Sequence, residues 1–257
     1  MNTNMKTIAM ALSAAGLVLA AQAREPLVVT LTFDDSTADH VIAAKSLEKR
    51  GWTGSFNIIT GWIGREGRNG SRKGAELTWD EVRAIKKAGH QVNSHTANHV
   101  RLKKLAEDGK LDVIRKEFAD SKAAIEKETG VAPKYLCHPF VQTTPEVDKL
   151  IVEAGMLPMT DLRINFGGED NDPGTETDLG HKLDKWYADG IKARDLMFHG
   201  IDKDVGVWRP FKSLADWEKT LDMLKEREQK GLVKVLNYDD FYAYAKKIGA
   251  APAVVMK

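Results

Sequence analysis

Cysteine is almost absent from this chain. Cys137 is the only cysteine among 257 residues, so no disulfide can form within the molecule and a small disulfide-held scaffold is excluded. The fold must therefore rest on a buried apolar core. With 42% hydrophobic residues, a chain of this length can form one barrel-sized domain or two small ones.

The chain also lacks an excess of charge of either sign. Its 38 Lys and Arg residues nearly balance its 37 Asp and Glu residues, which leaves a formal net charge of +1. No strong field attracts the protein to nucleic acid or to an anionic membrane surface. We expect no nucleic-acid partner and a ligand that is neutral or weakly charged.

Long hydrophobic runs are missing as well. The apolar run from Ile8 to Ala20 is short for a membrane span. Lys6 precedes the run and Ala21-Gln22-Ala23 follows it, in the order of a secretory signal with its cleavage site. We expect residues 1–23 to be removed and residues 24–257 to be exported as one domain, periplasmic or secreted, without membrane attachment. A retained N-terminal anchor is the alternative.

No linker, internal repeat or low-complexity tract divides the chain, and strand and helix patterns alternate along it. Strands are predicted at 28–33, 54–59, 90–94, 135–137, 156–160, 196–198 and 232–236. Helices are predicted at 38–50, 78–88, 112–128, 145–154, 213–229 and 239–247, and a loop at 163–180. Such alternation favours a parallel α/β fold. About seven strands indicate a distorted or incomplete (β/α) barrel, with a doubly wound open sheet as the alternative.

Two adjacent carboxylates, Asp34 and Asp35, follow the first predicted strand. The carboxyl ends of strands in parallel sheets and barrels carry the chemistry. One of the pair is therefore a candidate metal ligand and the other a candidate general base. The alternative is that they only begin a turn or cap the next helix.

Two histidines, His95 and His99, follow the third predicted strand. If the backbone turns helically there, both imidazoles lie on one face and can reach one cation. One carboxylate and two imidazoles leave positions open on a divalent ion, which is typical of a catalytic site. The second carboxylate is then free to accept a proton from water.

His199 ends a late predicted strand, where it could bind the metal, support a ligand or protonate a leaving group, or merely cap the strand. The turn Cys137-His138-Pro139-Phe140 could direct a backbone N–H at a developing oxyanion. Cys137 itself is interpreted as a small buried residue rather than a nucleophile. The basic cluster Arg65, Arg68, Arg72 and Lys73 is expected to be a solvated loop.

The order Thr32-Phe33-Asp34-Asp35, then Ser94–His99, then a Pro-aromatic turn, then a strand ending in His, resembles the polysaccharide deacetylases of carbohydrate esterase family 4, with their chitooligosaccharide deacetylase homology domain. The resemblance covers about Leu27 to His199. It implies that Asp34 is the catalytic base and His199 the catalytic acid. It also implies that Asp35, His95 and His99 hold a divalent metal, usually zinc, and that the amide of Phe140 binds the oxyanion.

The resemblance further implies hydrolysis of N-acetyl, less often O-acetyl, groups on a polysaccharide or oligosaccharide, with release of acetate. Pro139 and Trp186 are the residues expected to contact this acetylated carbohydrate substrate. Two alternatives stay open. One is a metal-dependent hydrolase of a non-sugar amide or cyclic imide on the same fold, and the other is a carbohydrate-binding protein that has lost its activity.

The chain departs from the family pattern in the third motif, which usually reads Arg-x-Pro-Tyr. Cys137 stands at the position of the arginine, and Val141 replaces the glycine that commonly follows. Another group must therefore set the pKa of Asp34. The fourth motif, an aspartate near a tryptophan, has only Asp184-Lys185-Trp186 as a counterpart.

Overall fold

The computed structural model describes residues 24–67, 74–166, 176–206 and 211–252. The predicted signal segment, 1–23, lies outside the described residues, and export stays a prediction. In the described part of the chain, no helix combines the length and the apolar character that crossing a membrane requires.

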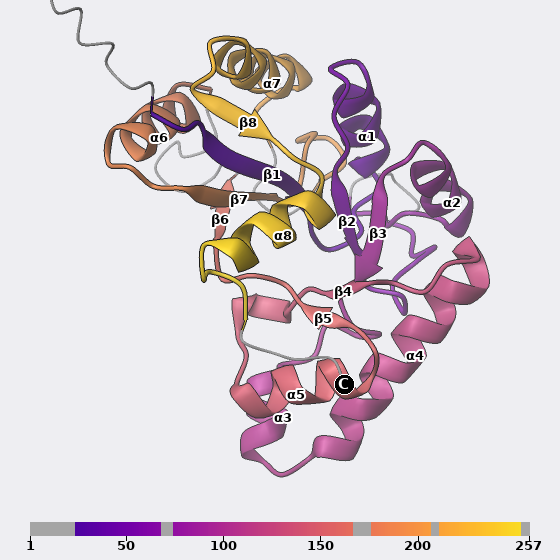
Figure 1. The fold of residues 1–257 in the computed structure, drawn as a ribbon. Helices are drawn as coiled ribbons and strands as arrows, with labels where there is room; N and C mark the ends of the chain where they lie inside the picture. Colours follow the sequence, from indigo (N-terminus) through magenta and orange to yellow (C-terminus); the bar gives the residue numbers. More distant parts are fainter. Residues whose placement is uncertain (1–23, 68–73, 167–175, 207–210, 253–257) are drawn as a thin grey trace, which may run out of the picture.

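The strands form one parallel sheet in the order β5-β4-β3-β2-β1-β7-β6, with β8 also pairing with β1. β8 pairs with the first half of β1, and β2 pairs with its last two residues. The sheet curls into a half-barrel (Figure 1), which confirms the prediction of an incomplete (β/α) barrel. The described strands are β1 (Leu27–Phe33), β2 (Ser55–Ile58), β3 (Gln91–Ser94), β4 (Tyr135–Leu136), β5 (Leu157–Pro158), β6 (Arg163–Phe166), β7 (Ala193–Phe198) and β8 (Val233–Val235).

Four of the described helices, α2, α5, α7 and α8, begin at residues whose side chains satisfy free backbone N–H groups. Thr78 and Glu81 form the predicted capping box of α2. Ser213 and Asn237 cap α7 and α8 in the same way, through the amide three residues on. The described helices are α1 (His40–Glu48), α2 (Trp79–Lys87), α3 (Leu102–Glu107), α4 (Leu111–Thr129), α5 (Pro145–Glu153), α6 (Glu176–Ala188), α7 (Leu214–Gln229) and α8 (Tyr238–Lys247).

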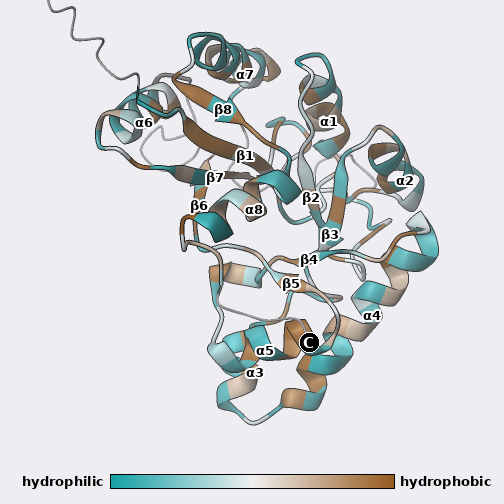
Figure 2. Cartoon of the chain, viewed as in Figure 1, coloured by the Kyte–Doolittle hydropathy of each residue, from teal (hydrophilic) through white to brown (hydrophobic). Residues whose placement is uncertain are grey.

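β1 is buried on both faces, and its alternation separates two environments. Leu31 and Phe33 face outward into the main apolar core beneath the helices. Val28 faces inward and packs with Tyr238 at the start of α8. In Figure 1, α8 lies across the curled sheet, and in Figure 2 β1 is hydrophobic along most of its length. Nearer the carboxyl end of β1, Thr32 also faces inward, and its hydroxyl donates a hydrogen bond to Asp195. The interior of the barrel is therefore polar at this end and apolar around Val28.

The prediction of a loop at 163–180 is wrong, because β6 lies within it and α6 begins within it. Residues 163–166 alternate polar and apolar side chains and pair in parallel with β7. Phe166 faces the main core, while Arg163 is buried without being apolar. The sequence did not indicate this strand because its inward side chains, Arg163 and Asn165, are polar. Polar side chains occur here because the interior of the barrel is polar near the strand ends.

Candidate active site

A cavity of about 410 Å³ opens at the carboxyl ends of the strands. This volume lies within the range typical of small-molecule sites. The five predicted catalytic and metal-binding side chains line it together with side chains of two later strands and of the Pro139–Val141 turn. The lining residues are Asp34, Asp35, His95, His99, His138, Phe140, Val141, Asn165, Met197 and His199.

The two adjacent carboxylates have different surroundings because the strand ends between them. The backbone N–H of Asp34 still donates to the carbonyl of Phe198 on β7, at 2.9 Å. Asp35 and Ser36 then adopt left-handed conformations, with φ of 75° and 59°. A non-glycine residue adopts this conformation only where its surroundings enforce it. The turn sends Asp34 into the barrel and Asp35 toward the histidines.

His95 and His99 meet through a strained loop rather than a helix. The conditional expectation of a helical turn is wrong, since residues 95–99 form no helix. Thr96 and His99 have φ of 67° and 56°, and the Thr96 hydroxyl accepts a hydrogen bond from the His99 N–H at 2.9 Å. The imidazole centroids lie 4.8 Å apart.

Asp35, His95 and His99 have the spacing of a metal site. Asp35 Oδ1 lies 3.3 Å from His95 Nε2 and 3.4 Å from His99 Nε2. Ligand atoms at Zn–N and Zn–O distances in a tetrahedral site are separated by about 3.4 Å. The Asp35 oxygen is buried and has no hydrogen-bond partner within the described residues. The three residues therefore fit a divalent cation.

The two imidazoles are prepared for this role in different ways. His95 Nδ1 lies 2.9 Å from the carbonyl of Cys137, which can only accept, so Nδ1 carries the hydrogen and Nε2 faces Asp35. Burial lowers the pKa of His99 to about 4, and the charge of His95 adds to this effect. Burial also acts to lower the pKa of His95, but Cys137 and the carboxylates of Asp34 and Asp35 raise it well above its usual value. A bound cation would displace the His95 proton.

Arg163 supplies the cation that the third motif lacks. Its Nη2 lies 2.5 Å from Asp34 Oδ2, and both side chains are almost fully buried. Asn57 donates to the other Asp34 oxygen at 2.7 Å. Burial alone would raise the pKa of Asp34, but Arg163, together with His95, holds it well below its usual range. The strand pattern of residues 163–166 was the sequence signal that could have identified this residue.

Asp195 lies on the far side of Arg163. Its Oδ2 is 3.6 Å from Arg163 Nε, and its Oδ1 accepts from the Thr32 hydroxyl at 2.7 Å. Arg163 is closer to Asp34, so its charge favours the Asp34 anion. Complete burial raises the pKa of Asp195 to about 7, although Arg163 opposes the rise.

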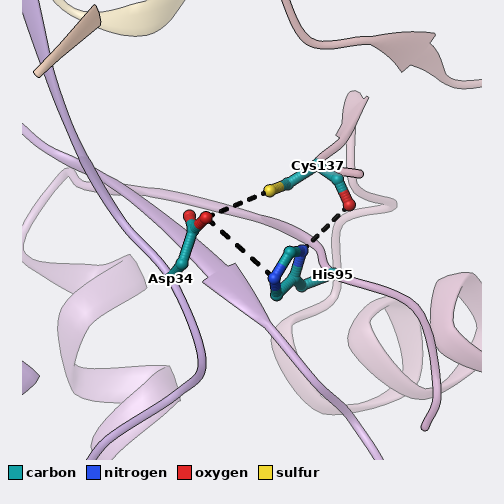
Figure 3. A group of neighbouring side chains, drawn as sticks. All are labelled: Asp34, His95 and Cys137. Atoms are coloured by element: carbon teal, nitrogen blue, oxygen red, sulfur yellow. Dashed lines mark hydrogen bonds and ion pairs between the residues drawn. The ribbon is translucent and has the colours of Figure 1, made fainter. Parts of the chain in front are cut away.

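Cys137 contacts both Asp34 and His95 but does not have the environment of a nucleophile. Figure 3 shows its sulfur facing Asp34, at 3.4 Å, and its carbonyl facing His95. Burial raises the pKa of its thiol, although Arg163 opposes the rise. Asp34, His95 and Cys137 could also be seen as a ligand set. Arg163 lies 2.8 Å from the sulfur and pairs with Asp34, so its charge excludes a cation there.

His199 and the Pro139–Val141 turn also border the cavity. His199 Nε2 lies 3.7 Å from Asp35 Oδ2, and burial lowers the pKa of His199 while Asp34 opposes the shift. Its carbonyl is bound to buried His40 at 2.8 Å. Phe140 and Val141 have φ of 60° and 53° and line the cavity, whereas Pro139 is buried behind them.

Trp186 does not line the cavity, where the contact with the sugar was expected. It lies on α6, against the outer face of the sheet, with its ring 6.2 Å from that of Phe166. The inner face of β6 carries the cavity residue Asn165 instead. Asp184, the counterpart of the fourth motif, is bound to Arg227 on α7 and takes no part in the site.

The half-barrel brings two carboxylates and three histidines, Asp34, Asp35, His95, His99 and His199, to one cavity at its strand ends, which is where enzymes built on parallel barrels carry their chemistry. A family model described as polysaccharide deacetylase matches residues 21–159, and the chain belongs to that family. No curated protein matches the chain.

Solved structures support the fold. A structure described as a putative polysaccharide deacetylase from Mycobacterium smegmatis is 16% identical, with a TM-score of 0.62 over 92% of this chain and 96% of the other. A family 4 acetyl xylan esterase from Clostridium thermocellum, in complex with a cobalt ion, is 16% identical, with a TM-score of 0.57 over 85% and 92%. A family 4 pseudoenzyme from Bacillus anthracis is 17% identical, with a TM-score of 0.56 over 84% and 65%.

Proposed function

We propose that the protein is a metal-dependent carbohydrate deacetylase, which hydrolyses N-acetyl, or O-acetyl, groups on a polysaccharide or oligosaccharide and releases acetate. On an N-acetyl group it would act on a carbon–nitrogen bond other than a peptide bond. The observation that carries the proposal is the convergence of Asp34, Asp35, His95, His99 and His199 on one cavity. Family membership supports the same activity.

The residues divide the work as follows. Asp34 stays ionised at neutral pH because Arg163 lowers its pKa, so it can accept the proton of an attacking water. The N–H of Phe140 stabilises the oxyanion, and His199 donates a proton to the leaving nitrogen or oxygen. Asp35, His95 and His99 would hold the metal, most simply zinc given one carboxylate and two imidazoles. When bound, this ion polarises the carbonyl and lowers the pKa of water.

The test measures acetate release from acetylated chitooligosaccharides and acetylated xylooligosaccharides, and ring opening of cyclic imides, each with zinc or with a chelator. We expect acetate from a sugar substrate, loss of release with chelator, and a loss of at least about 100-fold in Asp34→Asn and His95→Ala. Asp112→Asn is the matched control because Asp112 is fully exposed on α4.

The outcomes separate the alternatives. Turnover of a cyclic imide without acetate release would indicate the non-sugar hydrolase. Sugar binding without turnover in the presence of zinc would indicate a protein that has lost its activity, as in the pseudoenzyme with a similar fold. Full activity in Asp35→Ala would contradict the proposed metal site.

We also propose that the protein is exported after cleavage behind Ala23, from the signal-like order of residues 1–23. Fractionation of the producing cells, with mass spectrometry of the mature N-terminus, tests this. Export predicts a chain that begins at Arg24 outside the cytoplasm, and an intact Met1 in the cytoplasmic fraction would contradict it.

A further inference from the structure

His99 and Phe140 line the cavity, and a third aromatic ring, Trp62, lies on the other side of His99. The ring of His99 packs against Phe140, with centroids 4.5 Å apart, and against Trp62, with centroids 5.5 Å apart. The three residues follow β2, β3 and β4, which are neighbouring strands. Phe140 is 42% exposed and Trp62 is half-buried, so the rings border solvent.

An arginine side chain lies over the ring of Phe140, and another lies over the ring of Trp62. The guanidinium carbon of Arg101 lies 4.0 Å from the centroid of Phe140, and that of Arg65 lies 5.0 Å from the centroid of Trp62. Stacking on a ring holds a guanidinium by cation–π attraction and leaves its N–H edge free to donate. We call Arg65, Trp62, His99, Phe140 and Arg101 the arginine rim.

Neither guanidinium group of the rim is held by a carboxylate at ion-pair distance, although the charge of Arg65 acts on the nearby carboxyl group of Glu76. Both arginines are exposed, and across the described ranges neither side chain makes a hydrogen bond or an ion pair. Other arginines of the chain bind Asp or Glu side chains, namely Arg50, Arg83, Arg115 and Arg227. The N–H edges at the rim are therefore available to a ligand.

A guanidinium group lies over one face of each of the two outer rings, between that face and a sugar. Phe140 already contacts both His99 and Arg101, and Trp62 contacts both His99 and Arg65. The rim therefore presents two guanidinium forks beside the metal-site residue His99. A guanidinium fork matches the two oxygens of a carboxylate.

We propose that the arginine rim binds a carboxylate carried by a sugar residue next to the acetylated one, so that the substrate is an acidic, acetylated glycan. This inference rests on the proposed deacetylase function and adds the substrate class to it. The small net charge of +1 does not oppose it, because salt limits these attractions to about 8 Å and the recognition is local.

The test compares two acetylated oligosaccharides of equal length. One is a neutral N-acetylchitotetraose, and the other is a hyaluronan tetrasaccharide, in which glucuronic acid alternates with N-acetylglucosamine. The variants are Arg65→Gln, Arg101→Gln and the double variant. Arg115→Gln is the matched control, because Arg115 is an exposed arginine of α4 that already pairs with Asp112. Acetate release gives kcat/KM, and calorimetry on Asp34→Asn protein gives binding without turnover.

We expect wild type to favour the acidic oligosaccharide in kcat/KM and in binding. Each glutamine substitution should reduce this preference about fivefold, and Arg115→Gln should leave it unchanged. Raising the salt from 50 to 500 mM should reduce the preference as well. An equal loss on both substrates would mean that the arginines only hold the rings in place, and would overturn the inference.

Failure of this inference and failure of the proposed function give different results. If wild type releases acetate from both substrates without preferring the acidic one, the deacetylase stands and the carboxylate site is wrong. If no substrate releases acetate but the acidic oligosaccharide still binds in an arginine-dependent way, the site stands and the proposed activity fails. Equal binding of both oligosaccharides to wild type and to the double variant overturns the carboxylate site in either case.

Discussion

Arg163 reaches Asp34, the proposed catalytic base, from a strand outside the motif that usually supplies an arginine. The half-barrel brings the end of β4 and the start of β6 together across its interior, where Arg163 lies 2.8 Å from the sulfur of Cys137. An arginine at the end of β4 or at the start of β6 can therefore contact the same oxygen of Asp34. The small side chain of Cys137 leaves room for the guanidinium.

Replacement of Arg163 by methionine should impair the base. Without the cation of Arg163, burial raises the pKa of Asp34. Asp34 then becomes protonated at a higher pH than in wild type, so the variant should lose activity at a higher pH as the solution is acidified. We expect kcat to drop by at least about tenfold and the free energy of unfolding to fall by roughly 3–5 kcal/mol. Urea unfolding and pH–rate profiles on one substrate measure both changes.

The double variant Arg163→Met with Cys137→Arg is the informative control. It returns the arginine to the position that the family pattern favours, and partial recovery of the acid limb is expected. If Arg163→Met alone leaves the pH–rate profile unchanged, the assigned role of Arg163 is wrong.

Asp195 should make stability depend on pH. Its pKa is about 7 in the folded protein against 3.8 as the unperturbed value. The folded state therefore holds a proton that the unfolded state has lost between these values, and stability falls as pH rises through this window. Asp195→Asn does not titrate and therefore lacks this loss of stability. The difference in free energy of unfolding, variant minus wild type, should rise by up to about 4 kcal/mol between pH 4 and pH 8.

Urea unfolding at both pH values measures this difference. Asp216→Asn, at the first turn of α7, serves as a control away from the site. A constant difference between wild type and Asp195→Asn across the range would show that Asp195 does not titrate there.

At the scale of elements, α4 holds the loop that carries the histidines. Buried Glu117 accepts hydrogen bonds from the backbone N–H and the side-chain amide of Asn98, both at 2.8 Å. Asn98 directly precedes His99, whose backbone has φ of 56°. The helix thus stabilises a conformation that the loop would not adopt alone.

Glu117→Ala should weaken metal binding without removing a ligand. Groups that support ligands typically contribute 10- to 100-fold to metal affinity, and we expect a loss of about tenfold. Competition with a fluorescent zinc chelator measures it. Asp120→Ala, on the exposed face of the same helix, should bind zinc as wild type does. Equal affinity in Glu117→Ala and wild type would show that α4 does not support the site.

For the whole molecule, metal binding should raise thermal stability, because three ligands from two separate loops gain a common partner. At a free zinc concentration about 1,000 times Kd, the gain is about 4 kcal/mol, or roughly 10 °C in Tm for a domain of this size. Differential scanning calorimetry with zinc and with chelator tests this. His95→Ala should show no zinc-dependent shift, and an equal shift in that variant would place the metal elsewhere.

The sequence by itself determined most of the elements and the polar groups at their ends. Period-two runs such as 28–33 form strands, and local caps such as Thr78 with Glu81 begin helices, because both depend on neighbours within a few residues. Asp34, Asp35, His95, His99 and His199 line one cavity because parallel strands bring their carboxyl ends to one edge.

Only the tertiary structure decided which side chains meet inside the barrel. The partner of Asp34 comes from β6, 129 residues away along the chain, through curvature that no local pattern encodes. Trp186 was assigned to the cavity from its type, but α6 places it on the outer face of the sheet. Polar residues such as Arg163 resemble a loop in sequence, and they form a strand here because the interior of this barrel is charged and hydrogen-bonded.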